Sequence, residues 1–201
     1  MKWIISAIIF AVCAAVAYFS YFSHAASFKR EAAKSLQAYA QVVASQDKPQ
    51  LRAMHEQLLA PEAKITIRAQ YLSITEQVPV MTLAFDTPQF ITFIDGLVAK
   101  LTDTHFEPRL ENFTVNDDKN TASVIFTAKL WADGQGLYGL NTVPMRHSGD
   151  ARCEAQLRYV KPAVQMSAAE CTLDYRSLPK PGELGKMRDA IADEVKQQLG
   201  R

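Results

Sequence analysis

Cys153 and Cys171 are the residues whose spacing points most directly to chemistry. They occupy two strand-like runs that flank a turn at Lys161-Pro162-Ala163. If Pro162 is the midpoint of this turn, the numbers of facing residues add up to 324, as those of the two cysteines do. Facing cysteines in a non-hydrogen-bonded pair lie close enough to form a disulfide. The spacing therefore predicts a Cys153–Cys171 disulfide, with two buried thiols as the alternative.

Other constellations of reactive side chains are not predicted. The four histidines are scattered without a metal-binding spacing, and zinc at the cysteines would need two more ligands than the nearby sequence offers. We expect His55, beside an apolar helical stripe, to be a surface or half-buried side chain rather than a ligand. The acid–base candidates are explained at least as well by helix caps, turns and solvated strand faces; they are Asp86, Asp95, Asp103, His105, Glu107, His147 and Asp174. The sequence thus predicts no catalytic residue, no metal ligand and no cofactor.

The balance of charge excludes one large class of partner. The formal net charge of the chain is +1, and the part beyond residue 25 is neutral because its acidic and basic residues are equal in number. Proteins that bind nucleic acid carry a basic patch or stripe that neutralises phosphates. A neutral domain offers no such electrostatic attraction, so nucleic acid is not an expected partner.

The first residues form an apolar segment that could cross a membrane. No Asp, Glu, Lys or Arg occurs between Trp3 and Phe28, and aromatic residues lie at both ends of the run 3–22. About 20 apolar residues with aromatic ends are typical of a membrane-spanning helix. We therefore expect residues 1–25 to be a single-pass anchor in a bacterial inner membrane. A signal peptide cleaved near Ala25 is the alternative, which would leave a soluble periplasmic protein.

The side of the membrane on which the domain lies follows from the cysteines. Lys29, Arg30 and Lys34 follow the apolar segment, and the positive-inside rule weakly favours a cytoplasmic domain. A disulfide, in contrast, requires an oxidising compartment. Because the predicted disulfide is the stronger indication, we expect the domain to lie in the periplasm.

Hydrophobic periodicity predicts the elements that must position these residues. Helices are indicated by apolar residues three and four apart, and strands by alternation. Asp47 and Asp86 have the spacing of helix N-caps, with Pro49 and Pro88 in the first turns. The predicted helices are 27–46, a short one after Asp47, 86–101, and an amphipathic one at 181–199. The predicted strands are 64–74, 78–85, 105–115, 121–131 and the cysteine hairpin 151–175. The glycine-containing stretch 132–150 reads as an irregular loop that could serve partner binding.

This order of elements resembles the nuclear transport factor 2-like, or ketosteroid-isomerase-like, superfamily. The residues that carry the resemblance are AYAQVVASQDKPQLRAMHEQLLAPEAKITI, at 38–67, which read as helix, Asp turn, helix and strand. The resemblance implies an α+β fold in which a cone-shaped, curved antiparallel sheet packs on three helices, here over residues 26–180. Residues 181–201 would add the C-terminal amphipathic helix. It also implies an apolar pocket in the cone, where Tyr39 could lie, although the carboxylate partner used by the isomerases has no visible counterpart.

The whole chain is similar in organisation to the inner-membrane assembly subunits of type IV secretion systems. Those proteins have a membrane helix followed by a periplasmic domain of this fold. The leading hypothesis is accordingly a membrane-anchored, non-catalytic binding or assembly module within an envelope complex or a homo-oligomer. A carrier of a small ligand or lipid, and an isomerase or dehydratase, are the alternatives. Candidate pocket or partner contacts are Tyr39, Tyr71, Trp131, Tyr138 and Tyr159.

Overall fold

A computed structural model describes residues 23–72, 78–138, 141–160, 163–183, 185–186 and 188. The predicted anchor 3–22 lies outside this range, as does most of the predicted helix 181–199. Glu183, Gly185, Lys186 and Arg188 of that helix are described and helical. In the ranges just given, no helix is both long and apolar enough to cross a membrane.

Three helices in the described residues begin at side-chain caps. Helix α2 spans His24–Ser45, α3 spans Lys48–Leu58, and α4 spans Thr87–Val98. The Asp47 carboxylate accepts a hydrogen bond from the backbone N–H of Gln50. Asp86 and Gln89 form a reciprocal capping box at the start of α4. The sequence therefore predicted the starts of α3 and α4 correctly, because caps are local signals.

The strands form one six-stranded sheet. They are β1 (Leu59–Tyr71), β2 (Met81–Asp86), β3 (Leu101–Val115), β4 (Thr121–Tyr138), β5 (Asn141–Val160) and β6 (Ala163–Pro179). Their order across the sheet is β2-β1-β6-β5-β4-β3. The prediction of an antiparallel sheet is wrong at one boundary, since β1 and β6 run parallel. These strands are far apart in the chain, so no hairpin turn forces them to run in opposite directions.

The prediction of an irregular loop at 132–150 is wrong. β4 continues to Tyr138 and pairs with β5 from Asn141 onward. Two glycines lie within these strands because neighbouring side chains occupy the space above them. A Cβ atom on Gly136 would lie 2.7 Å from the Met145 side chain, and one on Gly134 would lie 3.0 Å from His147 Nε2. Glycine here makes room for a facing side chain rather than ending the strand.

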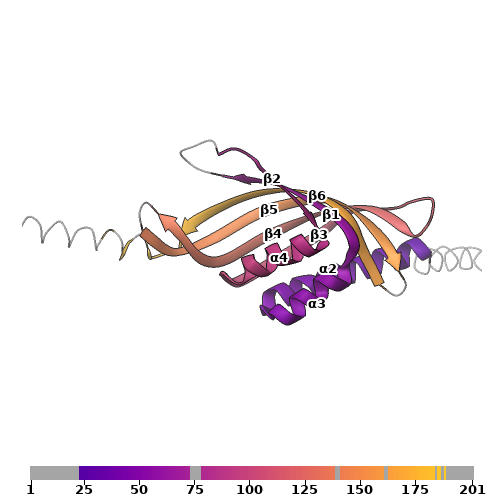
Figure 1. Cartoon of the computed structure of the whole chain (residues 1–201), viewed down its shortest axis with the longest axis horizontal. Coiled ribbons are helices and arrows are strands. Elements are labelled where there is room, and N and C mark those ends of the chain that lie inside the picture. The colour runs from indigo at the N-terminus through magenta and orange to yellow at the C-terminus, as the bar shows by residue number, and fades with distance from the viewer. Residues whose placement is uncertain are drawn as a thin grey trace, which may run out of the picture.

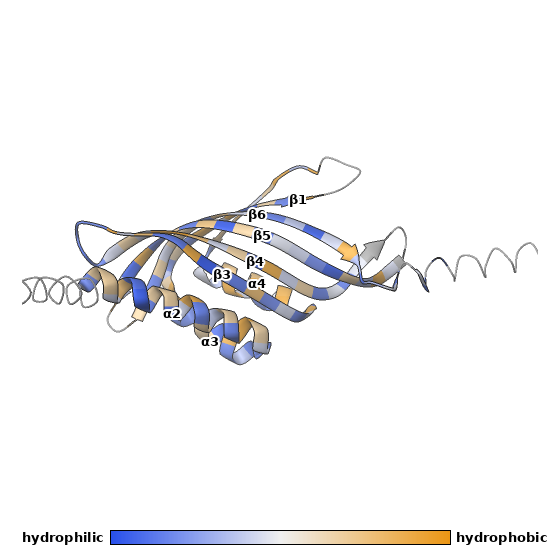
Figure 2. Cartoon of the chain, turned by 180° about the vertical axis from the view of Figure 1, so that it is seen from behind, coloured by the Kyte–Doolittle hydropathy of each residue, from blue (hydrophilic) through white to orange (hydrophobic). Residues whose placement is uncertain are grey.

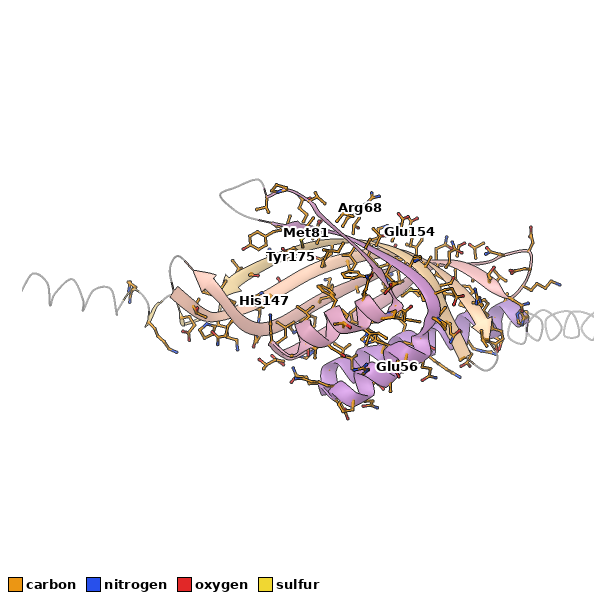
Figure 3. The ribbon with its side chains drawn as sticks, viewed as in Figure 1. Glu56, Arg68, Met81, His147, Glu154 and Tyr175 are labelled. Carbon is orange, nitrogen blue, oxygen red and sulfur yellow. A yellow bond between two sulfur atoms is a disulfide. The ribbon has the colours of Figure 1, made fainter. Side chains whose placement is uncertain are left out.

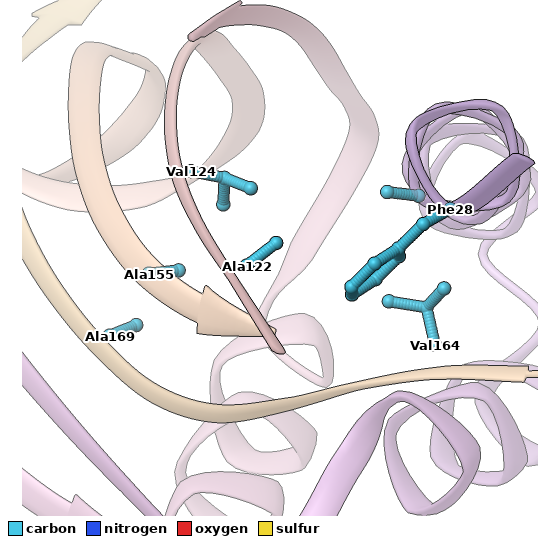
Figure 4. Packing of buried hydrophobic residues seen from close by; sticks show 7 residues of the cluster. Phe28, Ala122, Val124, Ala155, Val164 and Ala169 are labelled. Carbon is cyan, nitrogen blue, oxygen red and sulfur yellow. The ribbon is translucent and has the colours of Figure 1, made fainter. Parts of the chain in front are cut away.

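The three helices α2, α3 and α4 lie on one face of the sheet, which we call the inner face; none of the described helices covers the opposite, outer face (Figure 1). Hydrophilic and hydrophobic residues alternate along the central strands (Figure 2), as expected where only one face is buried. Phe28 of α2 is fully buried and packs on small inner-face residues (Figure 4). That cluster contains Phe28, Ala32, Ala122, Val124, Ala155, Val164 and Ala169. A second cluster, of Leu59, Ile65 and Ile91, joins α4 to β1.

Cys153 and Cys171 face each other on β5 and β6 and form a disulfide, with their Cα atoms 4.1 Å apart. The pairing agrees with the prediction, but the turn differs from it. Val160 pairs with Ala163, so the hairpin is centred between 161 and 162 rather than on Pro162. A β-bulge between the Leu157–Met166 and Gln156–Ala168 pairs leaves Ser167 as an extra residue and brings the cysteines into register.

Candidate functional site

A polar pair lies between the helices and the inner face. Tyr39 of α2 and His55 of α3 are joined by a hydrogen bond of 2.9 Å between the hydroxyl and Nε2. The tyrosine ring contacts Phe106 edge-on, and the histidine ring contacts Phe90 in the same way. His55 is only 2% exposed, so the expectation of a surface or half-buried histidine is wrong. Tyr39 lies between α2, α3 and β3, and its role as a pocket residue stays a prediction.

Burial keeps this pair neutral. It lowers the pKa of His55, an effect that the charge of Asp95 partly opposes, and it raises the pKa of the Tyr39 hydroxyl. His55 Nδ1 is buried without a hydrogen-bond partner among the described residues. Leaving such an atom unpaired costs about 1 to 3 kcal/mol. The arrangement could exchange a proton with a small ligand, since a neutral imidazole can donate at one nitrogen and accept at the other.

Asp133 is the one buried carboxylate in the described part of the chain, and it does not reach this pair. Its oxygens bind Arg146 Nε at 2.9 Å and Lys180 Nζ at 2.6 Å. Hydrogen bonds from these two cations lower the pKa of Asp133 to about 2. A carboxylate held so firmly in its charged form is a poor proton donor or acceptor at neutral pH. Asp133 therefore joins β4, β5 and the residue after β6 and is not an acid–base group.

The outer face contains a groove of about 290 Å³ where β4, β5 and β6 lie beside the end of β1. We call it the outer groove. Its lining residues are Leu72, Lys129, Leu130, Trp131, Ser148, Gly149, Asp150, Asp174 and Arg176. Cross-strand pairing arranges the outward-facing ones in two rows. Lys129, Asp150 and Asp174 form one row, and Trp131, Ser148 and Arg176 form the next.

Charges of both signs line the outer groove. Arg176 donates a hydrogen bond from Nε to Ser148 Oγ at 3.3 Å. Asp150 and Asp174 lie directly opposite each other, and neither forms an ion pair with another described residue. Trp131 is stacked on His105 with ring centroids 4.6 Å apart, which fixes its orientation. The groove thus offers acids, bases and a positioned aromatic ring in a small space.

Leu72, at the end of β1, is the exposed apolar residue that lines the groove, whereas Met81 of β2 pairs with inner-face Ala69. Leu72, Val80 and Met81 are 47%, 54% and 48% exposed. The β1–β2 hairpin rises from the sheet on the side away from the helices (Figure 1), and Met81 lies on it (Figure 3).

The predicted contact residues do not form one site. Tyr39 lies in the cone and Trp131 in the outer groove. Tyr71 pairs its ring with Tyr175 on the inner face, with centroids 5.3 Å apart. Tyr159 packs against Phe28 with centroids 5.1 Å apart. The side chain of the fifth predicted contact residue, at position 138, lies outside the part of the chain that the structure describes.

Sequence reasoning missed the other groove residues and the burial of His55. Alternation of charged residues along β5 and β6 was the available signal for the groove. It predicts that Ser148 and Asp150 share a face with one another, as do Asp174 and Arg176. This alternation does not predict which strands are neighbours in the sheet. The order of the strands decides whether the residues of β5 meet those of β6.

Comparisons with known proteins identify the fold. No family model and no curated protein matches the chain. Among solved structures, a proposed scytalone dehydratase from Novosphingobium aromaticivorans matches with a TM-score of 0.51 at 8% identity, over 72% of this chain and 83% of that one. The β subunit of a proposed aromatic-ring-hydroxylating dioxygenase from the same organism matches with a TM-score of 0.49 at 9% identity, over 72% and 88%. A nuclear transport factor 2-like protein of unknown function from Silicibacter pomeroyi matches at 0.41 and 11%, over 72% and 93%. At these identities the likeness is of fold alone.

Proposed function

We propose that this protein is a membrane-anchored binding module of the bacterial periplasm, which holds a partner protein in the outer groove and performs no catalysis. The observation that carries the proposal is the groove itself. It lies on the sheet face that none of the described helices covers, and it combines charged side chains, a fixed tryptophan and the exposed Leu72. Protein interfaces concentrate their binding energy in such settings, where an aromatic or arginine anchor is surrounded by partly apolar surface.

The size of the groove also favours a protein partner. A volume of about 290 Å³ lies at the lower end of the range for small-molecule pockets. The groove is open to solvent and includes the exposed Leu72 at one side, so it can take one or two side chains of a larger surface. A drug-sized molecule would leave most of its own surface exposed there.

The proposed location rests on two features. Residues 3–22 have the length and aromatic ends of a membrane anchor, and the Cys153–Cys171 disulfide suits an oxidising compartment. Alkaline phosphatase fused after residue 201 tests the location, because that enzyme is active only after export. Activity is expected, whereas an inactive fusion at normal protein levels would place the domain in the cytoplasm.

Site-specific photocrosslinking tests the binding role. A photoreactive amino acid replaces Ser148, in the groove, or Thr127, which lies on the same outer face of β4 outside it. The full-length chain is then produced in its own membrane. We expect a discrete cross-linked protein from position 148 and not from position 127. No product from position 148, or the same products from both positions, would refute the assignment of the groove.

A second function is favoured by the buried pair of Tyr39 and His55. A neutral acid–base pair among aromatic rings could hold a small apolar ligand in the cone, as a carrier or an enzyme of the isomerase or dehydratase type would. Native mass spectrometry of the intact protein tests this function. A co-purified ligand that is lost in Tyr39→Phe would support it, and a ligand-free wild-type protein would count against it.

A further inference from the structure

We propose that β2 is an interface between two copies of this chain, in which the two β2 strands pair antiparallel and join the two sheets into one. The occupant of this surface is therefore a second copy of the protein. The inference goes beyond the proposed function, because the interface uses none of the residues that line the outer groove.

The backbone of β2 is paired on one side only. β2 lies at the end of the strand order, so β1 is its one neighbour in the described sheet. Along the other side of β2, no backbone group of residues 81–85 is bonded to another described backbone group. A row of unpaired N–H and C=O groups is a template for pairing with a further strand.

The sequence of β2 contains none of the features that prevent such pairing. The stretch MTLAF, at 81–85, has no charged residue, no proline and no glycine, and its pairing with β1 is regular. Edge strands that must stay single are interrupted by charges, prolines or bulges. Pro79 and Asp86 lie just outside the stretch and limit a new pairing to about these five residues.

The opposite edge of the sheet is protected in each of these ways. β3 contains Pro108, which has no N–H to donate, and its register with β4 shifts twice. One shift lies at Asp103, whose φ is 50°. The charged side chains of β3 are Asp103, Glu107, Arg109 and Glu111. A β2–β3 contact between copies is therefore disfavoured, and pairing of β2 with β2 closes at two copies instead of forming a filament.

Apolar side chains continue this edge onto the inner face. Met81, Leu83 and Phe85 point to that face, because their partners on β1 belong to the core. Phe93 of α4 lies against Phe85 with ring centroids 4.9 Å apart, and Leu97 is one turn further along the helix. Met81, Phe93 and Leu97 are 48%, 37% and 43% exposed. We call these five residues the apolar edge.

A second copy of β2 matches the apolar edge in one register. With a twofold axis at Leu83, this residue meets Leu83 of the second copy, and Met81 meets Phe85. On the outer face, Thr82 meets Ala84. Apolar side chains thus pair with apolar ones, and no like charges are opposed. A partner strand with charges at these positions would bury them without counter-charges, which is unfavourable.

Sedimentation velocity of the full-length protein in detergent tests the inference. Thr82→Lys places a charge on β2, and Thr114→Lys places the same charge on an exposed threonine of the other edge strand, β3. We expect dimers of the wild type and of Thr114→Lys, and at least tenfold weaker association of Thr82→Lys, because a lysine on an edge strand opposes pairing. A monomeric wild type, or similar association of the two variants, would overturn the inference.

Cross-linking in the membrane tests the register independently. Leu83→Cys and Leu110→Cys replace half-buried inner-face leucines of the two edge strands, in a chain that also carries Cys13→Ala. The two remaining native cysteines are bonded to each other, so a short bismaleimide reacts with the new thiol alone. A cross-linked dimer is expected from position 83 and not from position 110. Equal yields, no product from position 83, or a product of position 83 with a different protein would count against a second copy at β2.

Discussion

Replacing Asp133 with asparagine should destabilise the domain in a way that depends on pH. The Asp133 side chain is 7% exposed and binds Arg146 and Lys180 at 2.9 and 2.6 Å. These contacts lower its pKa from 3.8 to about 2, which converts to at most about 2.5 kcal/mol of free energy of unfolding. Arg146 and Lys180 are 48% and 35% exposed, so solvent screening reduces the expected loss to about 1 to 2 kcal/mol.

The sign of the pH dependence follows from the direction of the pKa change. The carboxylate of Asp133 is protonated at a lower pH in the folded chain than in the unfolded chain. Its contribution is therefore complete above about pH 4 and disappears as the pH falls toward 2. The wild-type protein and Asp133→Asn should differ in stability at pH 6 and converge between pH 4 and pH 2.

Urea unfolding followed by circular dichroism, at several pH values, measures this difference. Glu111→Gln is the matched control, since Glu111 also binds an arginine, Arg152 at 2.6 Å, but is 39% exposed. An exposed ion pair of this kind contributes about 0 to 1 kcal/mol. A constant difference between wild type and Asp133→Asn across the pH range, or an equal effect of Glu111→Gln, would refute the reasoning.

Three further substitutions or conditions test other parts of the fold by urea unfolding. Reduction of the Cys153–Cys171 bond, which joins residues 18 apart, should lower the free energy of unfolding by about 3 kcal/mol; an unchanged midpoint would show that the bond does not restrict the unfolded chain. Stability should fall as the pH drops through about 6.5, because burial lowers the pKa of His55 and the unfolded chain takes up the proton first; His55→Gln should flatten this slope. Gly149→Ala should cost about 2 kcal/mol or more, since its Cβ would lie 2.9 Å from a backbone oxygen of the neighbouring strand, whereas Gly96→Ala, with no atom within 4 Å of its Cβ, should stabilise by up to about 1 kcal/mol. Similar effects of the two alanine substitutions would contradict the assigned packing.

Local signals made much of the fold predictable. The caps at Asp47 and Asp86 act within one turn of helix, so the sequence alone placed the starts of α3 and α4. The order of elements and their alternation indicated an α+β fold with helices packed on a curved sheet. The cysteine pair was predicted from a turn centred on Pro162; the turn is centred between 161 and 162, and the bulge at Ser167 restores the pairing.

Non-local packing limited what could be predicted about the sites. His55 has the sequence context of a surface residue, and only the approach of α2 and α4 buries it. The glycines at 134 and 136 were misread because glycine is common in loops, while here facing side chains need the space. The outer groove depends on which strands are neighbours. β6 lies between β5, which precedes it directly in the chain, and β1, which is far from it in the chain. No periodicity within one strand contains that information.

The bulge at Ser167 changes which residues of β6 point toward the helices. Val164 and Met166 precede it on the inner face, while Ala169 and Cys171 follow it there, so the alternation switches from even to odd positions. The hairpin consequently tolerates deletion at one place and not at others. Removing Ser167 would give a straight ladder in which the cysteines still meet, whereas removing Thr172 or Glu154 would turn a whole strand segment over. The disulfide can therefore form only in the bulged register. A hairpin closed without the bulge would leave the two thiols on opposite faces of the sheet.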